Sequence, residues 1–166
     1  MATLKPLYGS SVAFTVTNLA SLATDTNLLA GWQSAVVDNT TNLSDDELVS
    51  AIIKAGSSAP TVNTTVEIWI YAALDDTPTY PDTITGTQGA VTLTSTNTKN
   101  SGLALLAIIT VDATANRLYS VKPTSVAALF GGNMPKRWGV YATHNTAVAL
   151  GTTQVVTRTP VQYQSV

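Results

Sequence analysis

Alternation of apolar and polar residues is the dominant pattern of the sequence, and it predicts β-strands. The clearest example covers residues 66–72, where Val66, Ile68 and Ile70 fall on one face of an extended segment. Similar patterns predict strands over residues 12–17, 32–37, 91–94, 103–111, 117–122, 137–143 and 154–163. Turn-forming residues, chiefly glycine, proline and asparagine, separate these segments.

Two of the predicted strands carry additional information. Residues 103–111 are apolar on both faces, so we expect a central strand that is covered on both sides. Pro160 lies within the last segment and cannot donate a backbone hydrogen bond, which indicates an edge strand or a bulge at that position.

The segment over residues 44–56 fits two structures. Ser44-Asp-Asp-Glu47 has the form of a capping box and Gly56 that of a C-cap, which together favour a helix over about residues 45–55. We favour the alternative, a strand over about residues 48–54, because the segment is rich in β-branched residues and because the strand at 66–72 needs a neighbour.

A second helical signal covers residues 124–130. Thr124 is a suitable N-cap and Gly131 would end the helix. We expect one or two helical turns here that connect two strands.

Eight or nine short strands separated by turns predict an all-β protein, a β-sandwich or a barrel, and we favour a single-domain antiparallel β-sandwich with one or two short helical turns. The first ten residues show no clear core pattern, so we divide the chain into an N-terminal arm (1–10) and a sandwich domain (11–166). The 28 threonines fit this architecture, because their branched Cβ favours extended backbone and their hydroxyl keeps an outer face wettable without charge.

Composition excludes several classes of function. The 166 residues contain no cysteine, which removes disulfide scaffolds, Cys-ligated zinc and thiol catalysis. Only 11% of residues are charged and the net charge is −2, so we expect no nucleic-acid partner. The longest apolar run, residues 103–109, is too short for a membrane helix, and the start lacks a signal-peptide pattern. We therefore expect synthesis in a cytoplasm and no membrane association.

No group of residues in the sequence has the pattern of a catalytic site. His144 is the single histidine, and no Gly-x-Ser-x-Gly elbow accompanies it, so we interpret it as a hydrogen-bonded residue at a strand end. Glu47 and Glu67 are the only glutamates, and no spacing selects a carboxylate pair among the acidic residues. We expect no enzymatic activity, no cofactor and no metal, although a small hydrolase that uses His144 stays as a remote alternative.

The acidic loop 74–82 is the best local candidate for a site. Asp75, Asp76 and Asp82 could surround a calcium ion with backbone carbonyls, but the loop lacks the alternating acidic pattern of calcium loops. We prefer a proline-stiffened turn with solvated carboxylates. Residues 86–89 have neither the spacing nor the lysine of a phosphate-binding loop.

Aromatic residues raise the possibility of sugar binding. Trp69 and Tyr71 share a face of their strand, as a carbohydrate-stacking platform would require, but Trp32, Trp69 and Trp138 all lie in predicted strands, where sandwich core is the simpler interpretation. Lys136-Arg-Trp138 is interpreted as a packing and ion-pair feature.

Three stretches together resemble a known group of proteins. Ile68-Trp-Ile-Tyr-Ala-Ala-Leu-Asp-Asp-Thr-Pro-Thr-Tyr-Pro-Asp82, Leu129-Phe-Gly-Gly-Asn-Met-Pro-Lys-Arg-Trp-Gly139 and Thr143-His-Asn-Thr146, with Ala35-Val-Val-Asp-Asn-Thr-Thr41 before them, are similar to small structural proteins of tailed bacteriophages. The resemblance implies a virion protein, a jelly-roll that decorates or cements the exterior of the capsid and binds the major capsid protein.

The resemblance directs attention to residues that could touch such a partner. The N-terminal arm and the acidic loop are the expected contact regions, and we also expect a homo-oligomer, either a dimer or a trimer. The alternative function is a carbohydrate-binding β-sandwich, for example a receptor- or glycan-binding module of a virion. The candidate contact residues are Leu4, Tyr8, Asp75, Asp76, Tyr80 and Asp82.

Overall fold

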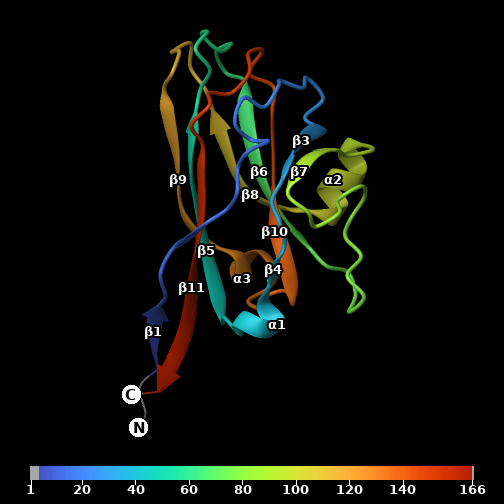
Figure 1. The fold of residues 1–166 in the computed structure, drawn as a ribbon, viewed down its shortest axis with the longest axis vertical. Helices are drawn as coiled ribbons and strands as arrows, with labels where there is room; N and C mark the ends of the chain where they lie inside the picture. Colours follow the sequence, from blue (N-terminus) through green and yellow to red (C-terminus); the bar gives the residue numbers. More distant parts are fainter. Residues whose placement is uncertain (1–3, 166) are drawn as a thin grey trace.

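The computed structural model of the protein describes residues 4–165, which form two antiparallel β-sheets packed face to face (Figure 1). The first sheet has the order β1 (Leu4–Tyr8), β11 (Val155–Ser165), β5 (Asp46–Lys54) and β9 (Leu118–Ser125), and β2 (Val12–Ala13) also pairs with β11. The second has the order β7 (Gly89–Thr92), β3 (Ala30–Gln33), β10 (Arg137–His144), β6 (Thr65–Ala72) and β8 (Ala104–Thr110), and β4 (Val37–Asp38) also pairs with β10. The predicted all-β sandwich is confirmed.

Three short helices lie between the strands: α1 (Asn39–Asn42), α2 (Thr96–Gly102) and α3 (Val126–Leu129). Ser125, not Thr124, caps α3, since its hydroxyl accepts a hydrogen bond from the backbone N–H of Ala128 at 3.0 Å. Helices α1 and α2 were not predicted. The longest of the three has seven residues, so no helix of the described chain could cross a membrane.

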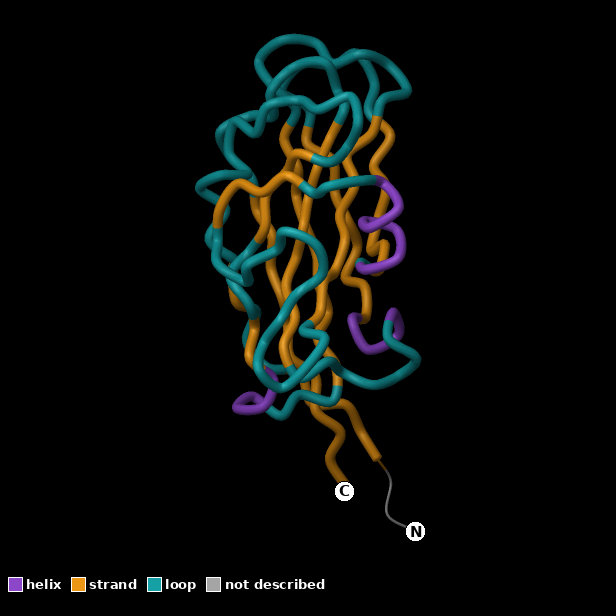
Figure 2. Tube along the Cα trace, turned by 90° about the vertical axis from the view of Figure 1, so that its right-hand side faces the viewer, coloured by secondary structure: helices purple, strands orange, loops and turns teal. Residues whose placement is uncertain are grey.

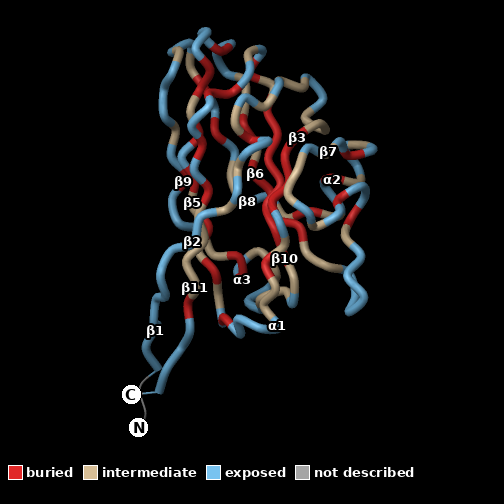
Figure 3. The backbone as a smooth tube through the Cα atoms, in the orientation of Figure 1, coloured by how far each residue is buried: buried red, intermediate tan, exposed pale blue. Residues whose placement is uncertain are grey.

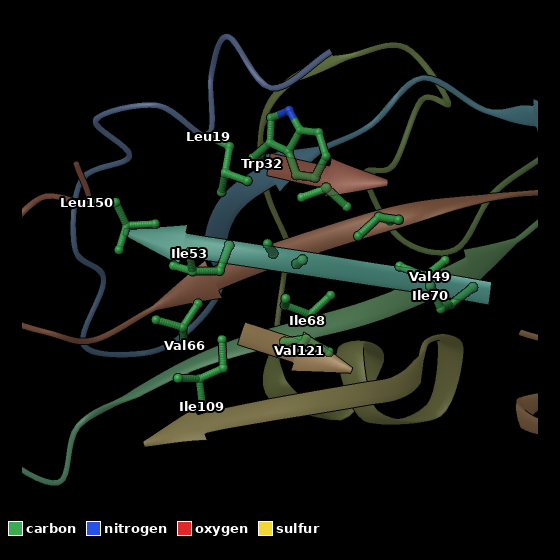
Figure 4. Close-up of a cluster of buried hydrophobic side chains, with 14 of the residues drawn as sticks. Leu19, Trp32, Val49, Ile53, Val66, Ile68, Ile70, Ile109, Val121 and Leu150 are labelled. Carbon is green, nitrogen blue, oxygen red and sulfur yellow. The ribbon is translucent and has the colours of Figure 1, made fainter. Parts of the chain in front are cut away.

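The main core lies between the two sheets. Val49 and Ile53 from β5 meet Ile68 and Ile70 from β6, and all four side chains are buried (Figure 4). The alternation predicted for residues 66–72 is what directs these residues inward, because successive side chains of a strand point to opposite faces. Trp32 and Trp138 complete this core from β3 and β10.

The second sheet is covered on its outer face as well. Trp69 and Tyr71 point away from the main core into a second buried cluster, together with Tyr141 of the neighbouring strand. The segment over residues 73–103, which includes β7 and α2, closes over this cluster and supplies Ile84, Leu93 and Leu103. Gly139 provides the space for Tyr71, because a Cβ at this glycine would lie 2.3 Å from the phenol oxygen.

The structure selects the strand for residues 44–56. β5 alternates between buried and more exposed positions along its length, which a helix would not do. Ser44 and Glu47 do meet, but through a side-chain hydrogen bond of 3.3 Å between the hydroxyl and Oε1, not through a capping box. The expected pairing is wrong: β5 lies between β11 and β9, while β6 lies between β10 and β8 in the other sheet.

Two further expectations about strands are corrected. The segment predicted over 103–111 contains an edge strand, β8 (Ala104–Thr110), in which Leu105 and Ile108 are 38% and 54% exposed. The strand predicted over 32–37 is interrupted: β3 ends at Gln33 and β4 begins at Val37, and the hydroxyl of Ser34 accepts a hydrogen bond from the backbone N–H of Val140 at 2.9 Å between them. In the segment 12–17, only Val12 and Ala13 are in a strand.

Pro160 lies opposite an irregularity in the neighbouring strand. β11 is not an edge strand, because β5 pairs with one side of it and β1 and β2 with the other. Tyr8 faces Val161 while Val12 faces Arg158, so the first strand contains one residue more than β11 over this stretch, which is the signature of a bulge. The prediction for Pro160 is therefore wrong: β11 is regular at this residue, and the irregularity lies between β1 and β2.

Candidate functional site

A two-stranded ribbon extends beyond the body of the sandwich. It consists of β1 and the end of β11, with Leu4 opposite Ser165 and Tyr8 opposite Val161 (Figures 1 and 2). Every residue of β1 is exposed, and Figure 3 shows the ribbon as the most continuously exposed part of the two sheets. Ribbons of two strands are marginally stable by themselves, so a partner that covers this one would stabilise it.

The two faces of the ribbon differ in chemistry. Residues that are directly opposite in a ladder point to the same face, and alternate residues point to opposite faces. The register therefore groups one apolar set, Leu4, Pro6, Tyr8 and Tyr163, on one face. Leu4, Tyr8 and Tyr163 are 69%, 60% and 55% exposed. The other face carries Lys5, Leu7, Gln162 and Gln164.

The free edge of the ribbon cannot extend easily by strand pairing. The backbone N–H of Gly9 donates to the carbonyl of Pro160 at 2.8 Å, so Gly9 faces β11 and, in the alternating ladder, Pro6 faces the open side. Because proline has no N–H, the open edge lacks a donor near its centre. The ribbon is thus suited to contact through side chains, not through an added strand.

A groove of about 310 Å³ lies at the root of the ribbon, on the face that carries Leu7. Its floor includes Arg158, whose guanidinium donates to Oε1 of Glu47 at 2.7 Å. Leu7 and Val12 provide apolar walls. The remaining lining residues are Gly9, Asn42, Ser44, Pro160 and Gln162.

Glu47 is the most unusual ionisable residue near this groove. Its side chain is fully buried, and Oε2 has no hydrogen-bond partner within the described residues, although Oε1 accepts from Arg158 and Ser44. Burial raises the pKa of this carboxyl, and the nearby Arg158 opposes the rise only in part. The pair joins β5 to β11 directly beneath the groove and thereby fixes the base of the ribbon.

The two neighbouring aspartates of the acidic loop have different partners. Asp75 accepts a hydrogen bond from the backbone of Thr79 at 3.1 Å, while Asp76 pairs with Lys136 at 2.6 Å. The carboxylates therefore turn toward separate partners, and residues 4–165 contain no group of three or more potential metal ligands. The segment Lys136-Arg-Trp138 is a packing and ion-pair feature, as predicted. Lys136 and Arg137 both form ion pairs, and Trp138 is buried.

The last two candidate residues of this loop are engaged in its own structure. Asp82 accepts hydrogen bonds from the backbone and hydroxyl of Thr94, both at 2.9 Å, and from the hydroxyl of Thr98. Burial raises the pKa of Asp82, but these hydrogen bonds outweigh it and hold the pKa below its usual value. Tyr80 packs edge-on against Tyr71 with ring centroids 5.6 Å apart.

The candidate contact residues thus fall into two separate regions. Leu4 and Tyr8 come together on the ribbon of the first sheet, while the acidic loop follows β6 of the second sheet, on the other side of the view in Figure 1. Sequence reasoning missed Tyr163, which the pairing of β1 with β11 places beside Leu4 and Tyr8 on the apolar face. No local signal could reveal it, because the pairing joins the two ends of the chain.

His144 is a hydrogen-bonded residue at the end of β10, as predicted. Its side chain is fully buried, and Nε2 donates to the carbonyl of Leu22 at 2.9 Å. Nδ1 lies 2.9 Å from the hydroxyl of Thr146, which also contacts the carbonyl of Val148 at 2.9 Å. Burial lowers the pKa of this imidazole.

The proposed sugar platform is not available for stacking. Trp69 is 7% exposed and Tyr71 is fully buried beneath the segment that covers the second sheet. Lys99 of α2 lies 5.2 Å from the centre of the Trp69 ring and donates to Oε2 of Glu67 at 2.8 Å. The interpretation of these aromatics as core is confirmed.

Neither a protein-family model nor a curated protein matches the sequence.

Proposed function

We propose that the protein is a non-enzymatic structural component of a tailed-bacteriophage virion, attached to the outside of the capsid through the major capsid protein. The observation that carries the proposal is the apolar face of the projecting ribbon, with Leu4, Tyr8 and Tyr163 exposed side by side on it. Exposed apolar groups that are clustered on a projecting element are typical of interaction sites. In this proposal the protein is made in the host cytoplasm and acts on the assembled particle.

The strand order supports assigning the sandwich more finely to the jelly-roll class. We count β1 and β2 as one strand and set β4 and β7 aside, which leaves eight strands in chain order. The two sheets then have the orders 1-8-3-6 and 2-7-4-5. This is the order of a jelly-roll, an architecture used by viral capsid proteins and by lectins.

The ribbon would act as an adhesive element. Burial of exposed apolar surface contributes roughly 25 cal/mol per Å², so three large side chains that enter a groove of the capsid protein would supply a few kcal/mol per copy. Repeated attachment over a particle would strengthen such modest contacts when several copies are linked, because the second binding event becomes intramolecular. The low charge of the chain, 11% of residues, would favour close approach to other copies.

The experiment measures occupancy on capsids. Particles of the parent phage that lack the protein are mixed with the purified chain, and bound copies are quantified after sedimentation. We expect the triple variant Leu4→Ser/Tyr8→Ser/Tyr163→Ser to lose at least about tenfold in apparent affinity, with an unchanged thermal melt because all three positions are exposed.

The matched control changes exposed apolar residues elsewhere on the same sheet. Leu118→Ser/Val155→Ser alters side chains that are 60% and 39% exposed but lie outside the ribbon, so binding should stay at the wild-type level. Asp76→Asn tests the acidic loop in the same assay. Full occupancy by the triple variant, or no binding by the wild type, contradicts the proposal.

A further inference from the structure

The edges of the two sheets differ in how well they are protected against pairing with another strand. The first sheet ends in β1, which contains Pro6, and in β9, which contains Lys122 and Pro123. On the second sheet, β7 is only four residues long. Short strands, lysine and proline are the devices by which proteins prevent edge-to-edge association.

The fourth edge, β8, is not short and contains neither lysine nor proline; its one irregularity is a bulge at Leu106, where the register with β6 shifts between Ile68 and Trp69. Its seven residues read Ala-Leu-Leu-Ala-Ile-Ile-Thr, without charge, proline or glycine, and β6 is the only strand that pairs with it in the described chain. Ile108 is 54% exposed on this edge and Leu105 is 38% exposed. An uncharged, exposed edge strand of this kind is a template for a further strand.

The backbone of β8 presents free hydrogen-bonding groups at its centre. Val111 donates to the carbonyl of Thr64 at 2.9 Å and accepts from the N–H of Asn63 at 3.0 Å, so Val111 faces β6. In an antiparallel ladder the residues alternate, and Ile108 and Thr110 therefore direct their N–H and C=O groups away from β6. These groups are available to a strand that arrives from outside.

We infer that β8 pairs with β8 of a second copy of this chain, in an antiparallel arrangement about a two-fold axis at Ile108. The two copies of Ile108 would then exchange both of their backbone hydrogen bonds, as residues of a hydrogen-bonded pair do. A two-fold axis brings identical strands together in the antiparallel sense. The two copies of β8 are therefore equal in length, and each residue pattern meets its own reverse.

Charge supports a second copy as the occupant. Residues 103–111 carry no charge, so identical strands meet no repulsion. The nearest charged neighbour in the ladder, Glu67, lies opposite Ile108 on β6, and Lys99 neutralises it at 2.8 Å. The edge therefore offers nothing to a charged partner and fits an apolar, uncharged strand. This inference concerns the isolated chain and does not depend on the proposed capsid attachment.

Sedimentation equilibrium of the full chain tests the pairing. The wild type should dimerise, and Ile108→Lys should raise the dimer dissociation constant by about 100-fold or more, because like charges would face each other across the axis. Leu118→Lys is the matched control, an exposed apolar residue on the edge that Pro123 protects, and it should leave the dimer intact.

A cross-linking variant tests the register without depending on dimer affinity. The chain has no cysteine, so Ile108→Cys introduces a single thiol. Paired residues of this type have Cα atoms about 5.5 Å apart, within disulfide range, and mild oxidation should give a covalent dimer. Leu118→Cys should form no covalent dimer under the same conditions, because position 118 lies on β9, away from the proposed axis.

Three outcomes overturn the inference. The first is a wild type that remains monomeric at high micromolar concentration. The second is a dimer that Ile108→Lys leaves intact. The third is a monomeric wild type whose capsid occupancy is abolished by Ile108→Lys, which would assign the edge to a strand of the capsid protein. The inference and the proposed function can fail separately. If Leu4→Ser/Tyr8→Ser/Tyr163→Ser loses capsid occupancy but still dimerises, capsid attachment and β8 pairing use different surfaces.

Discussion

Arg158 binds one carboxylate oxygen of Glu47 at 2.7 Å, while the other oxygen of the same fully buried carboxylate has no partner among residues 4–165. The pair connects the two central strands of the first sheet at the root of the ribbon. An ion pair in such surroundings offsets the cost of burying the charge only in part, which makes each partner dependent on the other.

Removal of Arg158 should therefore destabilise the folded protein, because the buried Glu47 carboxylate would lose its ion-pair partner. We expect Arg158→Met to lower the free energy of unfolding by about 3 kcal/mol at pH 7, as measured by urea denaturation, because the buried carboxyl of Glu47 would lose its counter-ion. The double variant Glu47→Gln/Arg158→Met should recover most of this loss. A double variant as unstable as Arg158→Met would show that the lost stability does not come from the unpaired carboxyl of Glu47.

The same variant should have a characteristic pH dependence. Burial raises the pKa of Glu47, so the folded state holds the proton more tightly than the unfolded state. The stability contributed by the protonated carboxyl is complete below the ordinary pKa and is lost as the pH rises through the folded-state pKa. The deficit of Arg158→Met should accordingly shrink as the pH is lowered from 7 toward 4. An equal deficit at both values would show that the lost stability is not due to the charge of Glu47.

His144 should make the protein sensitive to mild acid in the opposite sense. Its pKa is lowered by burial, so between this lowered value and the ordinary value of about 6.5 the unfolded chain binds the proton and the folded chain does not. The free energy of unfolding should fall as the pH drops below about 6.5. His144→Gln should flatten this slope in urea melts between pH 7 and pH 5, and an unchanged slope would mean that other groups cause it.

Gly139 should tolerate no side chain. A Cβ at this position would lie 2.3 Å from Cζ of the buried Tyr71 ring, which has no space to withdraw. We expect Gly139→Ala to lower the free energy of unfolding by about 3 kcal/mol, in the range of overpacked cores. Gly89→Ala is the control, since the nearest atom to its Cβ would be 4.0 Å away, and its thermal melt should stay close to that of the wild type.

Lys99 should hold the covering segment on the second sheet. Its ammonium donates to Glu67 at 2.8 Å and to the carbonyl of Leu28 at 3.0 Å. Lys99→Met would keep the aliphatic stem but leave the Glu67 carboxylate with Trp69 as its donor. Amide hydrogen exchange in residues 95–103 should accelerate at least about tenfold while exchange in β11 stays constant. Uniform acceleration over both regions would indicate global destabilisation in place of a local anchor.

Local patterns predicted the strands well where one face enters a core. Residues 66–72 alternate in sequence and in burial, and the β-branched residues of 46–54 outweighed an apparent capping box, because the strand buries every second side chain. The pattern of residues 103–111 led to a wrong prediction about the place of the strand in its sheet. Residues 103–111 are apolar on both faces, which predicted a covered central strand. In the structure β8 lies at an edge of its sheet, and Leu105 and Ile108 are partly exposed.

Relationships between distant segments could not be predicted in this way. The pairing of Pro6 with Tyr163 and the burial of Trp69 beneath α2 both depend on tertiary contacts that leave no periodic trace in the sequence. Leu4 and Tyr8 are exposed, whereas Tyr80 packs against Tyr71 and Asp82 accepts hydrogen bonds from Thr94; the role of these residues as partner contacts stays a prediction.

The position of β11 governs the order in which the chain can fold. The last strand in the described sequence lies between β1, β2 and β5, so the first sheet lacks its central member until residues 155–165 have left the ribosome. Until then β5 has only β9 beside it, and the N-terminal strands have no partner at all. The first sheet of a nascent chain should consequently stay incomplete until residues 155–165 have emerged, and non-local pairing of this kind makes its closure slow.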